Sequence, residues 1–268
     1  MNELKAEINR LKQIKPGIDC SYKTVNGVRL PVEIYVPEDN KNKQTLVIAI
    51  HGGSWYAVKE DAVTWDGSWM NFQAQYYVSK GFTAAVFSYR SIDFDETTTV
   101  FDLIDDCKDA VAFIRRQTET TRLILMGDSA GGHLSLMLGI DDSINADMVV
   151  AANPVLDCTE PSWKHIAKTE QDFIKASPAF HIQKIKPALL LLHGDSDTVV
   201  NCKITERYCD SMKQQKNDCE YIPLHGAEHA FLLQGYRSKD EDVMRYMNMI
   251  DEFIEICHLI QFRQTGFE

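Results

Sequence analysis

The beginning of the chain carries two hydrophobic patterns in succession. Residues 2–15 repeat apolar side chains at the spacing of a helix, at Leu4, Ile8, Leu11 and Ile14. This repeat predicts an outer amphipathic helix. Two strand-like runs follow at residues 22–25 and 28–36, and Asn26-Gly27 separates them. Because Asn-Gly is a strong signal for a tight hairpin turn, we predict that the sheet opens with an antiparallel pair of strands.

From Thr45 onward, short apolar runs alternate with longer segments of helical pattern. The apolar runs are TLVIAI, TAAVFSY, RLILMG, DMVVAANPV, ALLLLHG and EYIPLH. The helical segments are residues 69–79, 97–116, a segment that begins at Ser129, 203–216 and 240–259. This alternation predicts a mostly parallel central sheet with helices on both faces. Sheets of this kind bind ligands at the carboxyl ends of their strands, so candidate chemistry is expected there.

Residues 157–187 interrupt the alternation. The segment is too long for an ordinary connection, and connections of this size often form lids or binding loops. The whole chain has 268 residues, of which 44% are hydrophobic, enough to fill one large core. We therefore expect a single domain over residues 1–268 with a short cap or lid insertion at 157–187.

The charge of the chain argues against two classes of partner. A net charge of -11 without a cluster of basic residues would repel a nucleic-acid backbone or an anionic membrane. No apolar stretch reaches the roughly 18 residues of a spanning helix, and the N-terminus is charged. We predict no nucleic-acid or membrane partner and a cytoplasmic location, with a removed signal peptide as the open alternative. The seven scattered cysteines are expected to be reduced and mostly packed.

The sequence GDSAG at residues 127–131 follows an apolar strand and begins a helical segment. Such a strand-to-helix turn can lift a serine hydroxyl above the sheet, and its backbone neighbours then leave no room for side chains at Gly127 and Gly131. We therefore predict that Ser129 is a nucleophile. Because the N–H of Ala130 opens the helix, it can stabilise an oxyanion. The alternative is an ordinary glycine-rich turn.

A second loop, HGGSW at residues 51–55, directly follows the run TLVIAI. Nucleophile-elbow enzymes take further oxyanion N–H groups from a loop in this place, and paired glycines let the backbone approach a substrate carbonyl closely. We predict that Gly52 and Gly53 are donors. His51 is expected to make structural hydrogen bonds, because a catalytic base must lie beside Ser129.

An acid and a base are available after the last two predicted strands. Asp197 follows ALLLLHG and His229 follows EYIPLH. Asp197 is preferred to Asp195 because the acid lies further from the strand in such loops, and His229 is preferred to His225, which ends the strand. The resulting order of serine, aspartate and histidine is the one that accompanies a nucleophile elbow.

Together these features resemble the α/β-hydrolase superfamily, and most closely its esterase and lipase branch, from about Val28 to the C-terminus. The resemblance implies the α/β-hydrolase fold with no metal and no organic cofactor. The residues implied for the triad and the oxyanion hole are Ser129, Asp197, His229, Gly52, Gly53 and Ala130. Ser54 stands at the position where the oxyanion loop of this branch usually has a third glycine. The pattern His-Gly-Gly-x-Trp also resembles the loop of kynurenine formamidases.

Aromatic residues gather near the predicted site, where they could stack on a sugar ring or an acyl group. The candidates for substrate contact are Trp55, Tyr56 and Trp163, and core packing is the alternative for each tryptophan. The insertion is small for the cap of a lipase. We therefore predict a serine carboxylesterase that takes a small-molecule ester with a short acyl chain, with deacetylation of xylan-derived saccharides as the narrower candidate.

Three other functions stay open from the sequence. They are hydrolysis of an N-formylkynurenine-like amide, a small prolyl-oligopeptidase-like peptidase, and a binding module on an inactive hydrolase fold. Two further features are expected to be structural. His133 on the helix after the elbow is predicted to be structural or to line the pocket wall, and the acidic stretch at residues 102–109 is predicted to be the solvated face of a helix.

Overall fold

The computed structural model describes residues 2–38, 43–56 and 70–265. Its centre is an eight-stranded sheet with the order β1-β2-β4-β3-β5-β6-β7-β8. The strands are β1 Ile18–Val25, β2 Val28–Tyr35, β3 Thr45–Ile50, β4 Thr83–Phe87, β5 Arg122–Asp128, β6 Met148–Ala152, β7 Ala188–Gly194 and β8 Cys219–Leu224. Strand β2 pairs antiparallel with both β1 and β4, and the remaining neighbours pair in parallel. The predicted sheet, mostly parallel with an antiparallel start, is confirmed.

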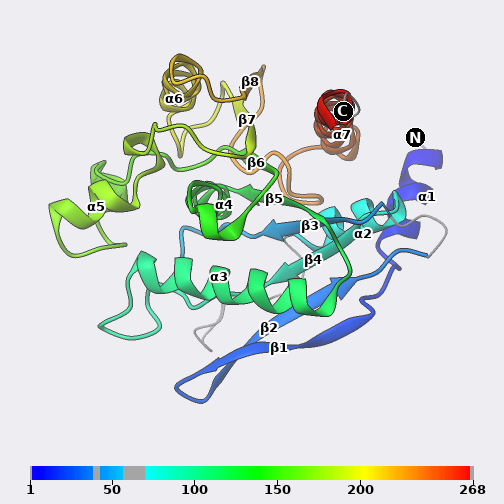
Figure 1. Cartoon of the computed structure of the whole chain (residues 1–268), viewed down its shortest axis with the longest axis horizontal. Helices are drawn as coiled ribbons and strands as arrows, with labels where there is room; N and C mark the ends of the chain where they lie inside the picture. The colour runs from blue at the N-terminus through cyan, green and yellow to red at the C-terminus, as the bar shows by residue number, and fades with distance from the viewer. Residues whose placement is uncertain (1, 39–42, 57–69, 266–268) are drawn as a thin grey trace.

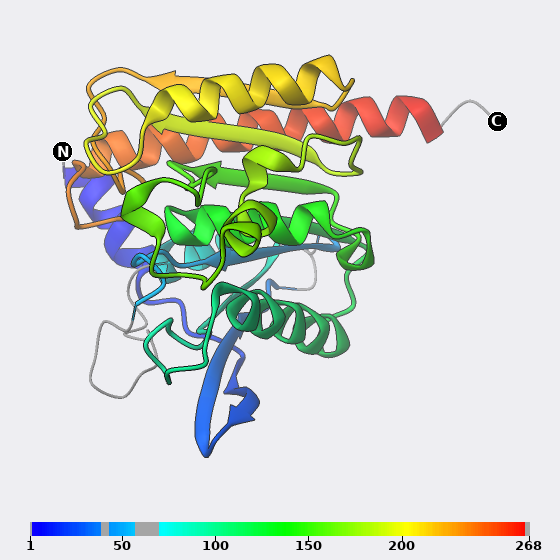
Figure 2. The same ribbon diagram turned by 90° about the vertical axis from the view of Figure 1, so that its left-hand side faces the viewer.

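Helices cover both faces of this sheet (Figures 1 and 2). They are α1 Asn2–Leu11, α2 Asn71–Ser79, α3 Val100–Gln117, α4 Ala130–Ile140, α5 Glu170–Ala176, α6 Cys202–Gln214 and α7 Asp240–Thr265. The two hydrophobic cores divide accordingly. One core contains buried residues of α3, α4 and α6, and the other contains buried residues of α1, α2 and α7. The alternating apolar faces of strands such as β3 supply both cores, because successive side chains of a strand point to opposite faces.

Helix α1 is shorter than its apolar repeat predicts, since it ends at Leu11 rather than near Lys15. The side chain of Gln75 on α2 donates to the backbone oxygens of Lys12 and Ile14, at 3.3 and 3.0 Å. This contact engages carbonyls of the turn that follows the helix. A tertiary partner thus shapes the boundary that the hydrophobic spacing left open.

The segment 157–187 contains α5 and two short 3-10 helices, Pro161–Trp163 and Pro178–Phe180. Several of its apolar side chains are buried in the same core as α3 and α4: Cys158, Trp163, Ile166, Phe173, Ala176 and Ile185. The backbone oxygen of Ile166 also accepts a hydrogen bond of 2.8 Å from Val100 N. The segment is therefore joined to the main core, and its role as a lid stays a prediction.

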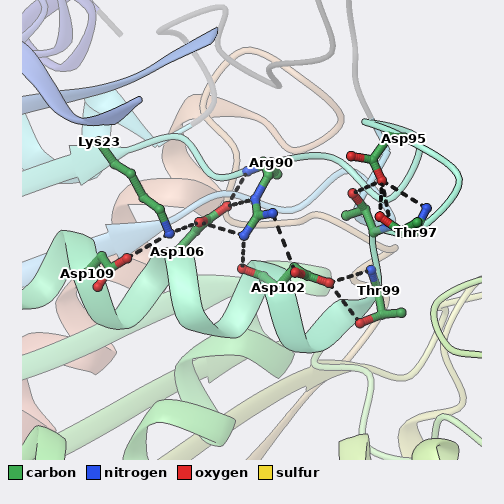
Figure 3. A network of polar contacts seen from close by, with 9 residues as sticks. Lys23, Arg90, Asp95, Thr97, Thr99, Asp102, Asp106 and Asp109 are labelled. Atoms are coloured by element: carbon green, nitrogen blue, oxygen red, sulfur yellow. Dashed lines mark hydrogen bonds and ion pairs between the residues drawn. The ribbon is translucent and has the colours of Figure 1, made fainter. Parts of the chain in front are cut away.

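The acidic stretch at 102–109 lies on α3, and the expectation that it forms only a solvated face is wrong for Asp106. The Asp106 side chain is completely buried, between Lys23 of β1 and Arg90 after β4 (Figure 3). Asp102, Asp105 and Asp109 are partly or largely exposed, as predicted. Lys23 and Arg90 approach α3 from the antiparallel part of the sheet, a proximity that spacing within the acidic stretch could not reveal.

None of the helices in the described part of the chain combines the length and the apolar composition needed to cross a membrane.

Candidate active site

Ser129 occupies a strained turn between β5 and α4. Its backbone has φ 55° and ψ -118°, a conformation that non-glycine residues rarely adopt. A Cβ added to Gly127 would lie 2.1 Å from the Gly131 oxygen, and one added to Gly131 would lie 2.0 Å from the Ile50 oxygen. Only glycine fits at these two positions, which is the steric reason for the spacing in GDSAG.

The structure brings the three predicted triad residues together. His229 Nε2 lies 3.0 Å from Ser129 Oγ, and His229 Nδ1 lies 2.7 Å from Asp197 Oδ2. Ser129, Asp197 and His229 follow strands β5, β7 and β8, whose carboxyl ends share one edge of the sheet. In this arrangement the serine hydroxyl donates to Nε2, while Nδ1–H donates to the carboxylate, so the imidazole can accept the serine proton.

His193, near the end of β7, is a second histidine at the same carboxylate, and sequence reasoning missed it. Its Nε2 lies 3.1 Å from Asp197 Oδ2, and its Nδ1 lies 2.7 Å from Thr205 Oγ1. The two contacts fit one neutral tautomer, in which Nδ1 accepts from the threonine hydroxyl and Nε2–H donates to the aspartate. The signal in the sequence was the histidine of ALLLLHG, four residues before Asp197.

Asp197 is held as an anion although its side chain is completely buried. Burial alone would raise the pKa of Asp197, but hydrogen bonds from His193 and His229 and from the Val200 N–H hold it well below its usual value. The N–H groups of Val199 and Val200 donate to Oδ1 at 2.8 and 2.9 Å. Both carboxylate oxygens are therefore fixed in position.

Asp128, the residue before the serine, is also buried, but its pKa shifts in the opposite direction. Burial raises the pKa of Asp128 to about 7, and the nearby His229 opposes that shift. Asn153, after β6, accepts a hydrogen bond of 3.1 Å from Ala230 N through its Oδ1. This bond fixes the backbone directly after His229.

A small cavity opens at Ser129, with a volume of about 200 Å³. It is lined by Gly53, Ser54, Asp128, Ser129, Val199, His229, Ala230, Leu233, Tyr236 and Arg237. Sequence reasoning did not predict the contributions of Val199, Leu233, Tyr236 and Arg237. These residues come from the loops that carry Asp197 and His229, whose course the hydrophobic pattern does not define.

The loop at 51–55 lies against the elbow, but its two glycines have different surroundings. Gly53 lines the cavity and has φ 105°. Gly52 is packed so closely that an added Cβ would lie 2.7 Å from the Asp128 oxygen. Gly52 is not among the lining residues, so the cavity favours Gly53 over Gly52 as a donor. Ala130 is the first residue of α4, where N–H groups have no partner within the helix.

The predicted aromatic contacts differ from expectation. Trp55 is fully buried and packs edge-on against Trp163, with 5.7 Å between ring centroids, and Trp163 is also buried. Packing, the alternative, therefore describes both tryptophans in this structure, and neither is among the residues that line the cavity at Ser129. Tyr56 is exposed and stacks on His165 at 4.8 Å. The two remaining tryptophans of the chain, Trp65 and Trp69, lie outside the described residues.

The other histidines near these motifs have structural contacts. His51 is buried, stacks on Tyr89 at 4.4 Å, and its Nδ1 lies 2.8 Å from the Gly52 oxygen. His133 is buried and its Nε2 lies 2.7 Å from the Ala176 oxygen. His225, the alternative to His229 as the base, is exposed and paired with Asp195 at 2.8 Å. It directly follows β8 and is not among the residues that line the cavity at Ser129.

Comparisons with known proteins point to esterases. A family model described as BD-FAE matches residues 32–157. The isoprenylcysteine alpha-carbonyl methylesterase ICME of Arabidopsis thaliana is 19% identical over 268 residues, and the match covers 85% of this chain and 59% of that protein. The chain thus spans well under two thirds of the length of that relative.

Solved structures of an esterase are also similar to this chain. The apo form of Thermogutta terrifontis esterase 2 has a TM-score of 0.75 and 25% sequence identity, covering 91% of this chain and 96% of that one. The same esterase phosphorylated by paraoxon has a TM-score of 0.75 at 25% identity, covering 91% and 95% of the two chains.

Proposed function

Because this chain is an α/β-hydrolase of the esterase and lipase branch, we propose that it is a serine carboxylesterase for small esters with short acyl chains. The observation that carries the proposal is the continuous set of hydrogen bonds from Ser129 through His229 to Asp197 at the mouth of a cavity. Each bond has the donor and the acceptor that nucleophilic catalysis by a serine requires.

The reaction follows from these positions. His229 accepts the proton as Ser129 Oγ attacks the ester carbonyl, and Asp197 stabilises the imidazolium that results. The N–H groups of Gly53 and Ala130 stabilise the oxyanion. His229 then gives the proton to the leaving alcohol, and an acyl group remains on Ser129. A water molecule, deprotonated by His229, releases the acid and restores the serine.

The size of the cavity favours a short acyl chain. A volume of about 200 Å³ lies below the roughly 300–1,000 Å³ of sites for drug-sized ligands. The narrower proposal, deacetylation of xylan-derived saccharides, loses the stacking surfaces of Trp55 and Trp163, because both are buried. Tyr56 is the exposed aromatic candidate that remains among the predicted contacts. A cytoplasmic location stays a prediction from the sequence.

The proposal is tested with p-nitrophenyl acetate, butyrate and octanoate, together with acetylated xylo-oligosaccharide and N-formylkynurenine. We expect the acetate or butyrate to be hydrolysed fastest and the activity to disappear in Ser129→Ala. Ser211→Ala, a serine of α6 outside the cavity lining, is the matched control and should retain activity. A strong preference for N-formylkynurenine would support an amide hydrolase instead, and activity that survives in Ser129→Ala would contradict the proposal.

A further inference from the structure

Arg237 is a cation at the cavity that the reaction above does not use. It lines the cavity together with Ser129 and His229. Among the described residues that line this cavity, Arg237 is the one lysine or arginine, in a chain with a net charge of -11. A single arginine here makes the potential at the cavity more positive than the net charge of the chain alone would make it.

The guanidinium of Arg237 is available to a ligand. Its side chain is 41% exposed, and its ion pair with Glu228 has an N–O distance of 3.7 Å, too long for a hydrogen bond. In the described part of the chain Arg237 makes no hydrogen bond within the protein. Arg90 is the contrast, because it is 13% exposed and its Nε donates to Asp106 at 2.7 Å while its Nη2 donates to the Asp102 oxygen at 3.2 Å (Figure 3).

Apolar surface lies beside this cation. Val199 and Tyr236 also line the cavity, and they are 45% and 57% exposed. The guanidinium carbon of Arg237 lies 5.3 Å from the centre of the Tyr236 ring, a distance at which the ring stabilises the cation. The local surface therefore suits a ligand with an apolar body and a carboxylate, which a guanidinium can bind through two parallel hydrogen bonds.

The position relative to His229 indicates which part of the ester meets Arg237. Val199 follows Asp197, and Tyr236 and Arg237 follow His229, so these side chains come from the loops that hold the imidazole. Gly53 and Ala130, the proposed oxyanion donors, come from other elements. Since His229 gives its proton to the leaving oxygen, the leaving group lies on the imidazole side of the serine.

We propose that Arg237 binds a carboxylate on the alcohol part of the substrate, so that the preferred substrates are short acyl esters of apolar, hydroxyl-bearing carboxylic acids. This inference rests on the proposed esterase function. Glu228, whose ion pair with Arg237 is long and exposed, would compete with the substrate carboxylate for the same guanidinium. Removing the Glu228 charge should therefore strengthen the selectivity that removing Arg237 weakens.

The test compares two acetates that differ in one charge, 4-acetoxybenzoate and 4-acetoxybenzamide. We expect the wild type to prefer the anionic ester, measured as the ratio of the two kcat/KM values. Arg237→Gln should lower this ratio about fivefold, chiefly through KM, and Arg237→Lys should lower it less. Glu228→Gln should raise the ratio, and salt should reduce the preference of the wild type.

Arg245→Gln is the matched control. Arg245 has the same kind of surroundings, with an ion pair to Asp242 at 3.0 Å and the Tyr246 ring at 5.1 Å, but it lies on α7 outside the cavity lining. Its ratio should equal that of the wild type. An unchanged ratio in Arg237→Gln, or an equal fall in Arg245→Gln, would overturn the inference while leaving the esterase function intact.

Two other outcomes also decide the question. A wild-type preference for monophenyl succinate over phenyl acetate, without a preference for 4-acetoxybenzoate, would place the carboxylate on the acyl side and overturn the inference as stated. If neither acetoxybenzoic derivative is hydrolysed in a Ser129-dependent way while p-nitrophenyl acetate is, the substrate class is wrong. If the wild type shows no Ser129-dependent hydrolysis of any ester, the proposed function is refuted, and the inference with it.

Discussion

Two buried carboxylates, Asp106 and Asp197, show how similar burial serves different ends. Both side chains have no exposed surface. Asp106 accepts from Lys23 Nζ at 2.6 Å and from Arg90 Nε at 2.7 Å, and both partners are cations throughout the working pH range (Figure 3). Its charge is therefore balanced permanently, and the group can only join β1, α3 and the segment after β4.

Asp197 is bound instead by imidazoles and backbone N–H groups rather than by a lysine or an arginine. Its partners are His229, His193 and the N–H groups of Val199 and Val200. In the proposed mechanism the carboxylate gains a full counter-charge only when His229 takes the proton of Ser129. This difference teaches that the partners of a buried charge, more than its burial, decide whether it stabilises the fold or the charge that develops in a reaction.

The largest expected effect comes from neutralising Asp197. Asp197→Asn should lower kcat by about 10⁴-fold, because an amide neither holds the reactive tautomer of His229 nor stabilises its cation. Circular dichroism should show an intact fold, and ester hydrolysis gives the rate. A fall in kcat of less than tenfold would contradict the catalytic role that distinguishes Asp197 from Asp106.

For Asp106 we expect a loss of stability with little change in kcat. Asp106→Asn leaves two cations beside α3 without their buried counter-charge, so the free energy of unfolding should fall by about 3 kcal/mol. Urea denaturation measures the change, and kcat of the folded fraction should remain near that of the wild type. Asp105→Asn, whose side chain is 69% exposed, is the control and should change stability by less than about 0.5 kcal/mol. Equal stability of the two variants would contradict the role given to Asp106.

Asp128 is a third buried carboxyl, and its pH dependence extends the comparison. Its pKa is raised from 3.8 to about 7 in the folded chain. Across that interval the unfolded chain ionises while the folded chain keeps its proton, so this group makes the wild type less stable as pH rises. Asp128→Asn does not titrate, and its stability relative to the wild type should therefore increase between about pH 4 and pH 7. Urea denaturation across this range measures the difference in the free energy of unfolding between Asp128→Asn and the wild type. A difference that stays constant with pH would refute the raised pKa of Asp128.

The smallest effect is expected at Thr205, which contacts Asp197 only through His193. Thr205→Val removes the hydroxyl that donates to His193 Nδ1, so His193 no longer has a fixed proton to donate to Asp197. We expect kcat to fall about five- to tenfold, the cost of roughly one hydrogen bond. Thr205→Ser keeps the hydroxyl, so its kcat should stay close to that of the wild type. Equal kcat values in Thr205→Val and Thr205→Ser would mean that the contact between Thr205 and His193 has no influence on the reaction.

The sequence was sufficient where local chemistry constrains the chain tightly. The glycines of GDSAG have no room for a Cβ, the hairpin turn requires Asn26-Gly27, and the triad residues follow strands whose apolar runs are unmistakable. These features are readable because each depends on neighbours in the chain. The alternation of apolar strands and helices then predicted the order of the elements along a mostly parallel sheet.

The rest depended on contacts between distant parts of the chain. Asp106 meets Lys23 across 83 positions, and nothing in the acidic stretch distinguishes Asp106 from its exposed neighbours. Trp55 has the residue type of a sugar platform but is buried against Trp163 from the insertion. Arg237 reaches the cavity because of the course of an irregular loop, which hydrophobic periodicity does not describe.

Covalent labelling with paraoxon tests most directly whether Ser129 is the nucleophile, since a similar esterase is phosphorylated by this compound. Intact-mass and peptide mass spectrometry would be followed together with hydrolysis of p-nitrophenyl acetate. We predict one phosphoryl group per chain on Ser129, loss of activity in proportion to labelling, and no labelling of Ser129→Ala. Full activity in a chain labelled at Ser129, or inactivation through a different residue, would contradict this prediction.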